Sequence, residues 1–507
     1  MNRIDQSAHA TGPDPRLGRR VVTNTLVQFA PAALRIILGI VLVAALSRYL
    51  GVAGLGEYAL VFTYVAIFNI VFNDWGLGTI VVRELSQRPG DRPALLASAA
   101  TLQVVISFAA YGVLLMTLTM LPYSQALKNA TMLYGLTLLL GPAHVLALLF
   151  EADLRLVKLL VPSALQVVLN FILSIGVVLL GGSLLALAGA SLVALTVRSV
   201  WTGYLGWREA GLKLTTFTRT LWRGWWALLR EAWPIGAAST FKMVWQQGPV
   251  LILGMFSLSA TGLFNAANRV PQQLILVPLA MNTSMFPLLA RSWVTDRARF
   301  ARQLDRLVGG SLFAVVPAVI FGVALAQPFV RLIFGTEFAG AGVAFALLLV
   351  TTGLMFPIVF LAEALNAAGH QRLNLLITVA LSPVVMALLF LLVPQGGASG
   401  AALALMLGYA TFMAALLAGA RWRLGEAAPV RALGVASLAA AFGGGALILS
   451  SPLGPVGAGT VGAAVAIVAF GLARPSIVSE YLGTFAEWRQ PVISGNPPAP
   501  AVVRPSE

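Results

Sequence analysis

The sequence predicts an all-α integral membrane protein with about 14 transmembrane helices, and two observations lead to this fold class. Of the 507 residues, 59% are hydrophobic and only 10% are charged, which is too few charges to coat several soluble domains. The hydrophobic residues gather in runs long enough to cross a bilayer, and short polar segments separate these runs. Most of the protein surface must therefore face lipid.

The candidate spans form two groups of six, followed by two more. The first six are expected at roughly 22–47, 55–81, 94–120, 128–150, 159–180 and 184–204. The others are expected at roughly 232–256, 263–289, 307–326, 341–368, 373–393, 398–419, 432–450 and 455–473. This pattern predicts two pseudo-symmetric six-helix bundles (21–204 and 232–425) and two C-terminal helices (426–475).

Two similar segments support the division into two halves. Leu50–Leu85 begins with a Gly-Leu corner, and Ala260–Trp293 is a weaker copy in which Gly262 aligns with Gly54. Repeats at such a separation are typical of transporters. Because each half has an even number of spans, the two halves are expected to be related by a pseudo-two-fold axis along the membrane normal.

The distribution of basic residues predicts the orientation. With the N-terminus in the cytoplasm, 26 of the 33 Lys and Arg residues fall on the cytoplasmic side and three on the opposite side. We therefore expect a multi-pass protein of the bacterial inner membrane, with polar cytoplasmic ends at 1–20 and 476–507. The net charge of +15 needs no nucleic-acid partner. The basic, aromatic connector at 205–231 is expected to lie as an amphipathic helix on anionic lipid.

Several kinds of chemistry find no support in the sequence. The chain has no Cys, and its three His residues (His9, His144 and His370) are scattered, so no metal site is expected. It also has no phosphate-binding P-loop and no recognisable catalytic constellation. We therefore predict that the protein is not an enzyme and that it needs no cofactor.

Four cations fall inside the predicted spans: Arg35, Arg198, Lys242 and Arg269. A cation at bilayer depth is costly and usually faces a partner or a watery cavity. Arg35 and Lys242 occupy the first span of each half and could together hold an anion with several oxygens, such as a pyrophosphate. The alternative is that these residues form structural ion pairs, and Arg198 could instead extend to the cytoplasmic interface.

Polar uncharged residues form a second matched set. Asn24 and Gln28 lie in the first span, and Gln246 and Gln247 lie in the first span of the second half. Amides both donate and accept hydrogen bonds, so they could line a cavity for sugar hydroxyls. They could equally join neighbouring helices in lipid.

Two acidic residues are candidates for coupling transport to an H⁺ or Na⁺ gradient or to the membrane potential. Glu57 follows the first Gly-Leu corner, and Asp74 lies later in the same span. For Glu57 a plain role at the start of a helix is the simpler interpretation. For Asp74 the favoured interpretation is a salt bridge to Arg83.

Four motifs resemble the Wzx-type polysaccharide flippases of the multidrug/oligosaccharidyl-lipid/polysaccharide (MOP) exporter superfamily. These motifs are LGVAGLGEYAL (50–60), GLGTIVVREL (76–85), FEADLRLVKLL (150–160) and GLFNAANRV (262–270), and the turn at Glu363–Leu373 adds to the resemblance. The resemblance implies a V-shaped pair of bundles, alternating access and a cationic cavity for a polyprenyl-pyrophosphate-linked oligosaccharide. It also implies membrane lipids and polysaccharide polymerase or export proteins as partners.

Three other functions stay open at this stage. Drug and cation antiporters of the MATE branch and lipid II flippases share the implied fold. The antiporters usually carry an acidic residue in the first span, where this chain has only Arg35. A membrane glycan polymerase should have a large non-cytoplasmic loop, whereas the predicted loops on that side are short.

Overall fold

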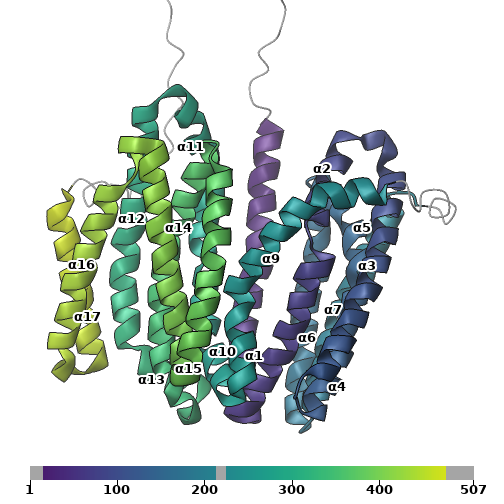
Figure 1. Ribbon diagram of the computed structural model, residues 1–507, viewed down its shortest axis with the longest axis horizontal. Helices are drawn as coiled ribbons and strands as arrows, with labels where there is room; N and C mark the ends of the chain where they lie inside the picture. The colour runs from purple at the N-terminus through teal and green to yellow at the C-terminus, as the bar shows by residue number, and fades with distance from the viewer. Residues whose placement is uncertain (1–14, 213–223, 476–507) are drawn as a thin grey trace, which may run out of the picture.

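The computed structural model describes residues 15–212 and 224–475, and every element in these ranges is a helix (Figure 1). Side chains are described from Leu34 onward, except those of Pro89, Thr283 and Ser284. The prediction of an all-α fold is confirmed. Of the predicted polar ends (1–20 and 476–507), residues 1–14 and 476–507 lie outside the described residues, as does the centre of the predicted connector (213–223). Residues 15–20 are helical.

The first half of the chain forms seven α-helices and three short π- or 3₁₀-helical segments. These are α1 (Pro15–Phe68), η1 (Asn69–Asn73), α2 (Leu77–Gln87), η2 (Pro89–Asp91), α3 (Arg92–Met120), α4 (Gln125–Gly135), η3 (Leu136–Leu140), α5 (Gly141–Ala152), α6 (Val157–Leu179) and α7 (Leu184–Glu209). The 54 residues of α1 reverse direction at Gly51, where φ is 65° and ψ is −174°. Glycine adopts this conformation without a steric penalty, so α1 contains the first two predicted spans.

The second half begins with a helix that replaces the end of the predicted connector. Its elements are α9 (Trp225–Phe256), α10 (Leu258–Leu274), α11 (Leu276–Thr295), α12 (Arg297–Ala324), α13 (Ala326–Phe334), η4 (Thr336–Ala341), α14 (Gly342–Ala367), α15 (Gln371–Leu424), η5 (Gly425–Ala427), α16 (Val430–Leu449), η6 (Ser451–Leu453) and α17 (Gly454–Ala473). Like α1, the long α15 turns within its length, at Gly397 (φ 51°).

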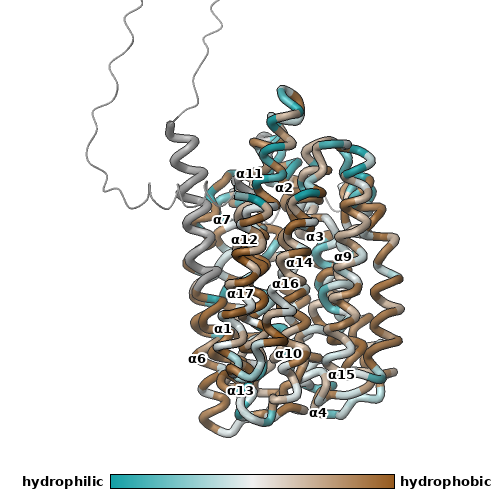
Figure 2. The backbone as a smooth tube through the Cα atoms, turned by 90° about the vertical axis from the view of Figure 1, so that its left-hand side faces the viewer, coloured by the Kyte–Doolittle hydropathy of each residue, from teal (hydrophilic) through white to brown (hydrophobic). Residues whose placement is uncertain are grey.

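Within the described ranges, ten helical segments are long and apolar enough to cross a membrane, or eleven if the bent α10–α11 pair counts as one span. Hydrophobic residues follow the length of the bundle, and hydrophilic residues gather mainly at its upper end (Figure 2). Two of the ten segments contain the turns at Gly51 and Gly397, and α9 is not among them. The protein is a multi-pass membrane protein, whereas the number 14 stays a prediction.

The helices form two groups, with α1 and α9 between them (Figure 1). We call the end that carries α2 and α11 the α2 end, and the opposite end, with α4 and α13, the α13 end. Helix α9 runs diagonally between the groups: at its start Trp225 Nε1 donates to the Ser98 carbonyl of α3 (3.1 Å). Farther along, Trp245 Nε1 donates to Ser382 Oγ of α15 (2.9 Å). One helix thus joins both groups.

The two halves meet closely where α1 and α10 cross. A Cβ atom built on Gly56 would lie 1.8 Å from the Leu258 carbonyl oxygen, and one built on Gly262 would lie 1.9 Å from the Val52 carbonyl oxygen. Only glycine permits such an approach of two backbones. This contact lies near the α13 end, because Gly56 comes shortly after the Gly51 turn and Gly262 comes shortly after the start of α10.

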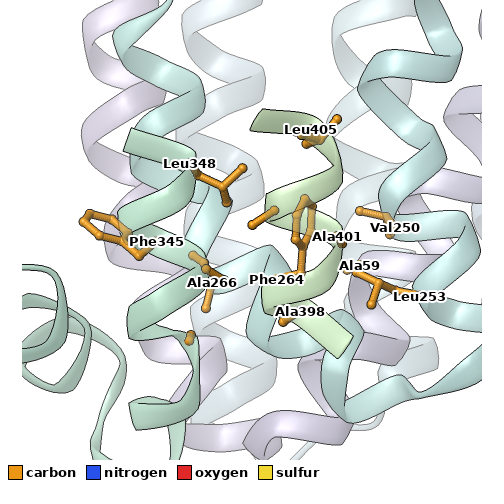
Figure 3. Packing of buried hydrophobic residues seen from close by; sticks show 14 of the residues in the cluster. Ala59, Val250, Leu253, Phe264, Ala266, Phe345, Leu348, Ala398, Ala401 and Leu405 are labelled. Atoms are coloured by element: carbon orange, nitrogen blue, oxygen red, sulfur yellow. The ribbon is translucent and has the colours of Figure 1, made fainter. Parts of the chain in front are cut away.

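A hydrophobic core continues across the same junction. Phe264 and Ala266 of α10 are buried together with Ala59 of α1, Leu348 of α14 and Ala401 of α15 (Figure 3). This core joins elements of both halves where α1 and α10 cross. The candidate site lies along these two helices.

Candidate functional site

A cavity of about 570 Å³ lies between α1, α6, α7, α9 and α10. Three arginines line it, Arg35 from α1, Arg198 from α7 and Arg269 from α10, and no Asp or Glu is among the described lining residues. Three of the four cations predicted from the sequence therefore share one cavity. The cavity carries a positive charge that acidic lining residues do not offset.

None of these three arginines forms an ion pair with another described residue. The alternative expectation, a structural role in ion pairs, therefore finds no support among the described residues. A guanidinium presents several N–H donors in a planar fork that matches the oxygens of a phosphate. The cluster is suited to hold an anion.

Arg269 lies against the backbone of α1. A Cβ atom on Gly39 would be only 2.6 Å from Arg269 Nη2. The guanidinium of Arg269 therefore occupies the space that a side chain at position 39 would fill. The Nε atom of Arg269 is buried and has no hydrogen-bond partner among the described residues. A buried donor without a partner is uncommon and often marks a site where another group binds.

The three arginines lie at similar depths between the two ends of the bundle. Helical rise places Arg35 about 24 Å from the Gly51 turn and Arg269 about 18 Å from Ser257, where α10 begins. Arg198 lies about 21 Å from the start of α7. The positive charge of these three arginines therefore lies near the middle of the membrane-spanning region and not at either end of it.

The rest of the polar lining consists mainly of amides. The seven amide side chains are the two predicted from the sequence, Gln246 and Gln247 of α9, and five others: Gln166, Asn170, Asn265, Asn268 and Gln272. Three hydroxyl groups accompany them: Tyr58, Thr63 and Ser163. Neutral groups that both donate and accept hydrogen bonds match the hydroxyl groups of sugars.

Sequence reasoning missed five of these amides, although a signal was present. Gln166 and Asn170 are four residues apart on α6, and Asn265, Asn268 and Gln272 follow the same helical spacing on α10. Residues three and four apart share one face of a helix. A polar stripe on an otherwise apolar helix indicates a face directed at a cavity.

Other predicted site residues lie elsewhere. Lys242 is exposed on α9 and is not among the residues that line the cavity. Glu57 is near Ser124 of the α3–α4 turn, whose Oγ donates to Glu57 Oε1 at 3.5 Å. The side chains of Asn24 and Gln28 lie outside the described part of the protein. The roles of these four residues stay predictions.

The favoured salt bridge between Asp74 and Arg83 is wrong. Arg83 pairs with its neighbour Glu84 (3.1 Å). It also pairs with Glu231 of α9, because the N-terminal turns of α9 pack beside α2. Asp74 is exposed after η1, and its role in ion coupling stays a prediction. Within residues 15–212 and 224–475, no three His, Asp or Glu side chains form a group that could hold a metal ion.

Long apolar helices around a central polar cavity define a multi-pass membrane protein of the transporter class. Residues 45–342 match the family described as polysaccharide biosynthesis protein, and the chain belongs to this family. No curated protein matches the sequence.

Solved structures with a similar fold belong to flippases and exporters. The lipid II flippase MurJ in an inward closed conformation is 12% identical, with a TM-score of 0.72, over 91% of this chain and 99% of that chain. An inward-facing multidrug resistance MATE transporter of the MOP superfamily is 15% identical, with a TM-score of 0.59, over 80% of this chain and 98% of that chain. A MOP superfamily transporter from Pyrococcus furiosus, described as having a binding pocket of reverse polarity, is 14% identical, with a TM-score of 0.57, over 84% and 99%. The fold is therefore that of the MOP superfamily, as the sequence motifs predicted.

Proposed function

We propose that this protein is a flippase that moves a polyprenyl-pyrophosphate-linked oligosaccharide from the cytoplasmic to the outer leaflet of the bacterial inner membrane. The observation that carries the proposal is the cavity whose described lining holds three arginines, seven amides and no carboxylate. The arginines would bind the pyrophosphate, and the amides would bind the sugars. The polyprenyl tail would stay in lipid.

The movement in this proposal is alternating access. The bundles at 21–204 and 232–425 would rock against each other, opening the cavity to one side at a time. Both chain ends would be cytoplasmic. Polysaccharide polymerase or export proteins would act on the translocated product. Substrate or a coupling ion can drive the cycle only if it binds the two states with different affinity.

The direct test measures leaflet access of a labelled polyprenyl-pyrophosphate oligosaccharide in proteoliposomes that contain the purified protein. We expect protein-dependent movement, lowered roughly tenfold or more by Arg35→Ala or Arg198→Ala, because each removes charge-assisted hydrogen bonds to phosphate. Arg299→Ala is the matched control, since Arg299 is exposed on α12 outside the cavity lining. Transport that survives replacement of all three cavity arginines would refute the pyrophosphate site.

The likeness to a lipid II flippase favours lipid II itself as a second candidate substrate. Competition in the same assay distinguishes the two. If excess lipid II blocks movement of the labelled oligosaccharide lipid and is itself moved faster, lipid II is the better substrate. A drug or cation antiporter is a weaker candidate, because a cavity lined by three arginines and no carboxylate repels cations.

A further inference from the structure

A second cavity, of about 430 Å³, lies where α9 begins and shares no lining residue with the central cavity. Helices α2, η2, α3 and α9 all contribute to its wall. Its charged lining residues are Glu84, Arg88, Asp91 and Glu231. The proposed transport mechanism makes no use of this cavity.

The charged groups of this cavity are only partly paired. Arg88 Nε contacts Glu84 Oε2 at 3.3 Å, which leaves the two terminal amino groups of Arg88 without a described partner. Arg83 pairs with both Glu84 and Glu231 from outside the cavity. The carboxylate of Asp91 has no described partner. The rim therefore offers an available carboxylate and an available guanidinium together.

Ser98 of α3 gives an independent indication that a ligand binds here. It lines the cavity and is 5% exposed, and its Oγ is buried without a hydrogen-bond partner among the described residues. Gly224, at the start of α9, lies close over it, since a Cβ atom there would be 2.6 Å from Ser98 Oγ. An unsatisfied buried hydroxyl is unfavourable, so a polar partner is expected at this wall.

The cavity lies at the boundary of the apolar part of the protein. Asp91 directly precedes the membrane-spanning segment Arg92–Met120, and Ser98 lies about 9 Å farther along α3. On the adjoining turns of α9, Trp226 is 75% exposed and Trp233 is 57% exposed. Exposed tryptophans are typical of the membrane–water interface. This position corresponds to the level of phospholipid headgroups.

We infer that this cavity binds a phosphoethanolamine group, as carried by the headgroup of an ethanolamine phospholipid. The ammonium group would bind the Asp91 carboxylate, and the phosphate would bind the free amino groups of Arg88. The Ser98 hydroxyl, about two helical turns deeper, would donate to an ester oxygen at the glycerol end of the lipid. The apolar lining residues Ile80, Leu95 and Leu228 would contact the glycerol end of the lipid. A choline headgroup has no N–H to donate to Asp91, and a headgroup without a cation would leave the Asp91 carboxylate unpaired.

The test uses the full-length protein, delipidated in detergent. Short-chain phosphatidylethanolamine, phosphatidylcholine with the same acyl chains, and soluble phosphoethanolamine are titrated separately, and bound ligand is counted by native mass spectrometry. We expect the ethanolamine lipid to bind and the choline lipid to bind at least tenfold more weakly. Asp91→Asn should lower the affinity for the ethanolamine lipid about tenfold, because a charge-assisted hydrogen bond is lost. Asp91 is exposed and unpaired, so this variant should fold normally.

Two further variants sharpen the result. Ser98→Ala should also weaken binding, whereas Asp296→Asn should leave it unchanged. Asp296 is an exposed helix N-cap outside the cavity, where Asn serves as well as Asp. Equal binding of the choline lipid, or unchanged binding in Asp91→Asn, would overturn the inference. Soluble phosphoethanolamine that binds as tightly as the lipid would confirm the headgroup chemistry and assign the site to a soluble ligand.

Discussion

Replacing Gly39 by Ala tests whether the position of Arg269 matters for transport. The new methyl carbon would lie 2.6 Å from Arg269 Nη2. Favourable contacts between such atoms are about 3.5 Å, so the guanidinium must move by about 1 Å. A misplacement of about 1 Å in a positioning group can lower a rate about 100-fold. We therefore expect transport in Gly39→Ala to fall by a factor of roughly 10 to 100.

The same change should not weaken the fold. Only the end of a flexible side chain has to move, and Ala in a helix interior is more favourable than Gly by about 0.5–1 kcal/mol. Thermal unfolding of Gly39→Ala should therefore occur at the same temperature or higher. Gly112→Ala of α3 is the matched control, because a Cβ atom there meets no other atom within 4 Å. It should gain similar stability and keep full transport.

The assay is leaflet access in proteoliposomes, carried out for Gly39→Ala, Arg269→Ala and the double variant. If Gly39 acts through Arg269, the double variant should transport no worse than Arg269→Ala alone, since coupled residues are not additive. A further drop in the double variant, equal to that of Gly39→Ala alone, would refute the reasoning. So would undiminished transport in Gly39→Ala.

Three further changes should alter the temperature of thermal unfolding in detergent. Gly56→Ala places a Cβ atom 1.8 Å from the Leu258 carbonyl oxygen, so the helices must separate at a cost of about 1–3 kcal/mol; an unchanged midpoint would contradict the close crossing. Trp245→Phe removes the buried 2.9 Å hydrogen bond to Ser382 and should cost about 1–2 kcal/mol, and Tm should fall accordingly. Arg474→Ala leaves Asp305 without its partner at 2.7 Å and should cost about 2–3 kcal/mol, with partial recovery in Arg474→Lys.

The positions of the arginines could be predicted because charge inside an apolar span is a strong signal. Arg35, Arg198 and Arg269 are each the only charged residue in their predicted span, and the cost of burying a cation implies that each faces a cavity or a partner. Lys242 met the same criterion and is nevertheless not among the cavity-lining residues. Sequence position along a span gives only an approximate depth: Lys242 lies one turn before Gln246 on the same face of α9, yet only Gln246 is among the described lining residues.

The pairing of the surface charges could not be predicted from neighbours in the sequence. Arg83 binds Glu231 of α9 in addition to its neighbour Glu84, and Arg155 binds Glu209 of α7 at 2.8 Å. These partners come from helices whose packing depends on the whole bundle. In the same way, the turn at Gly51 was visible as a Gly-rich corner, but its closeness to α10 follows only from tertiary packing.

The glycine contact between α1 and α10 has a geometric consequence for the arginine cluster. If the halves tilt about this contact as a pivot, displacement grows with distance from it. A tilt of about 10° moves groups about 20 Å away by roughly 3 Å, while the pivot itself hardly changes. Arg35 and Arg269 lie near that distance and on opposite arms of the lever. If the arms separate, the distance between these two guanidinium groups would change, so an anion held by both would favour one angle between the halves. In the proposed mechanism, a bound anion would therefore set the angle between the two halves.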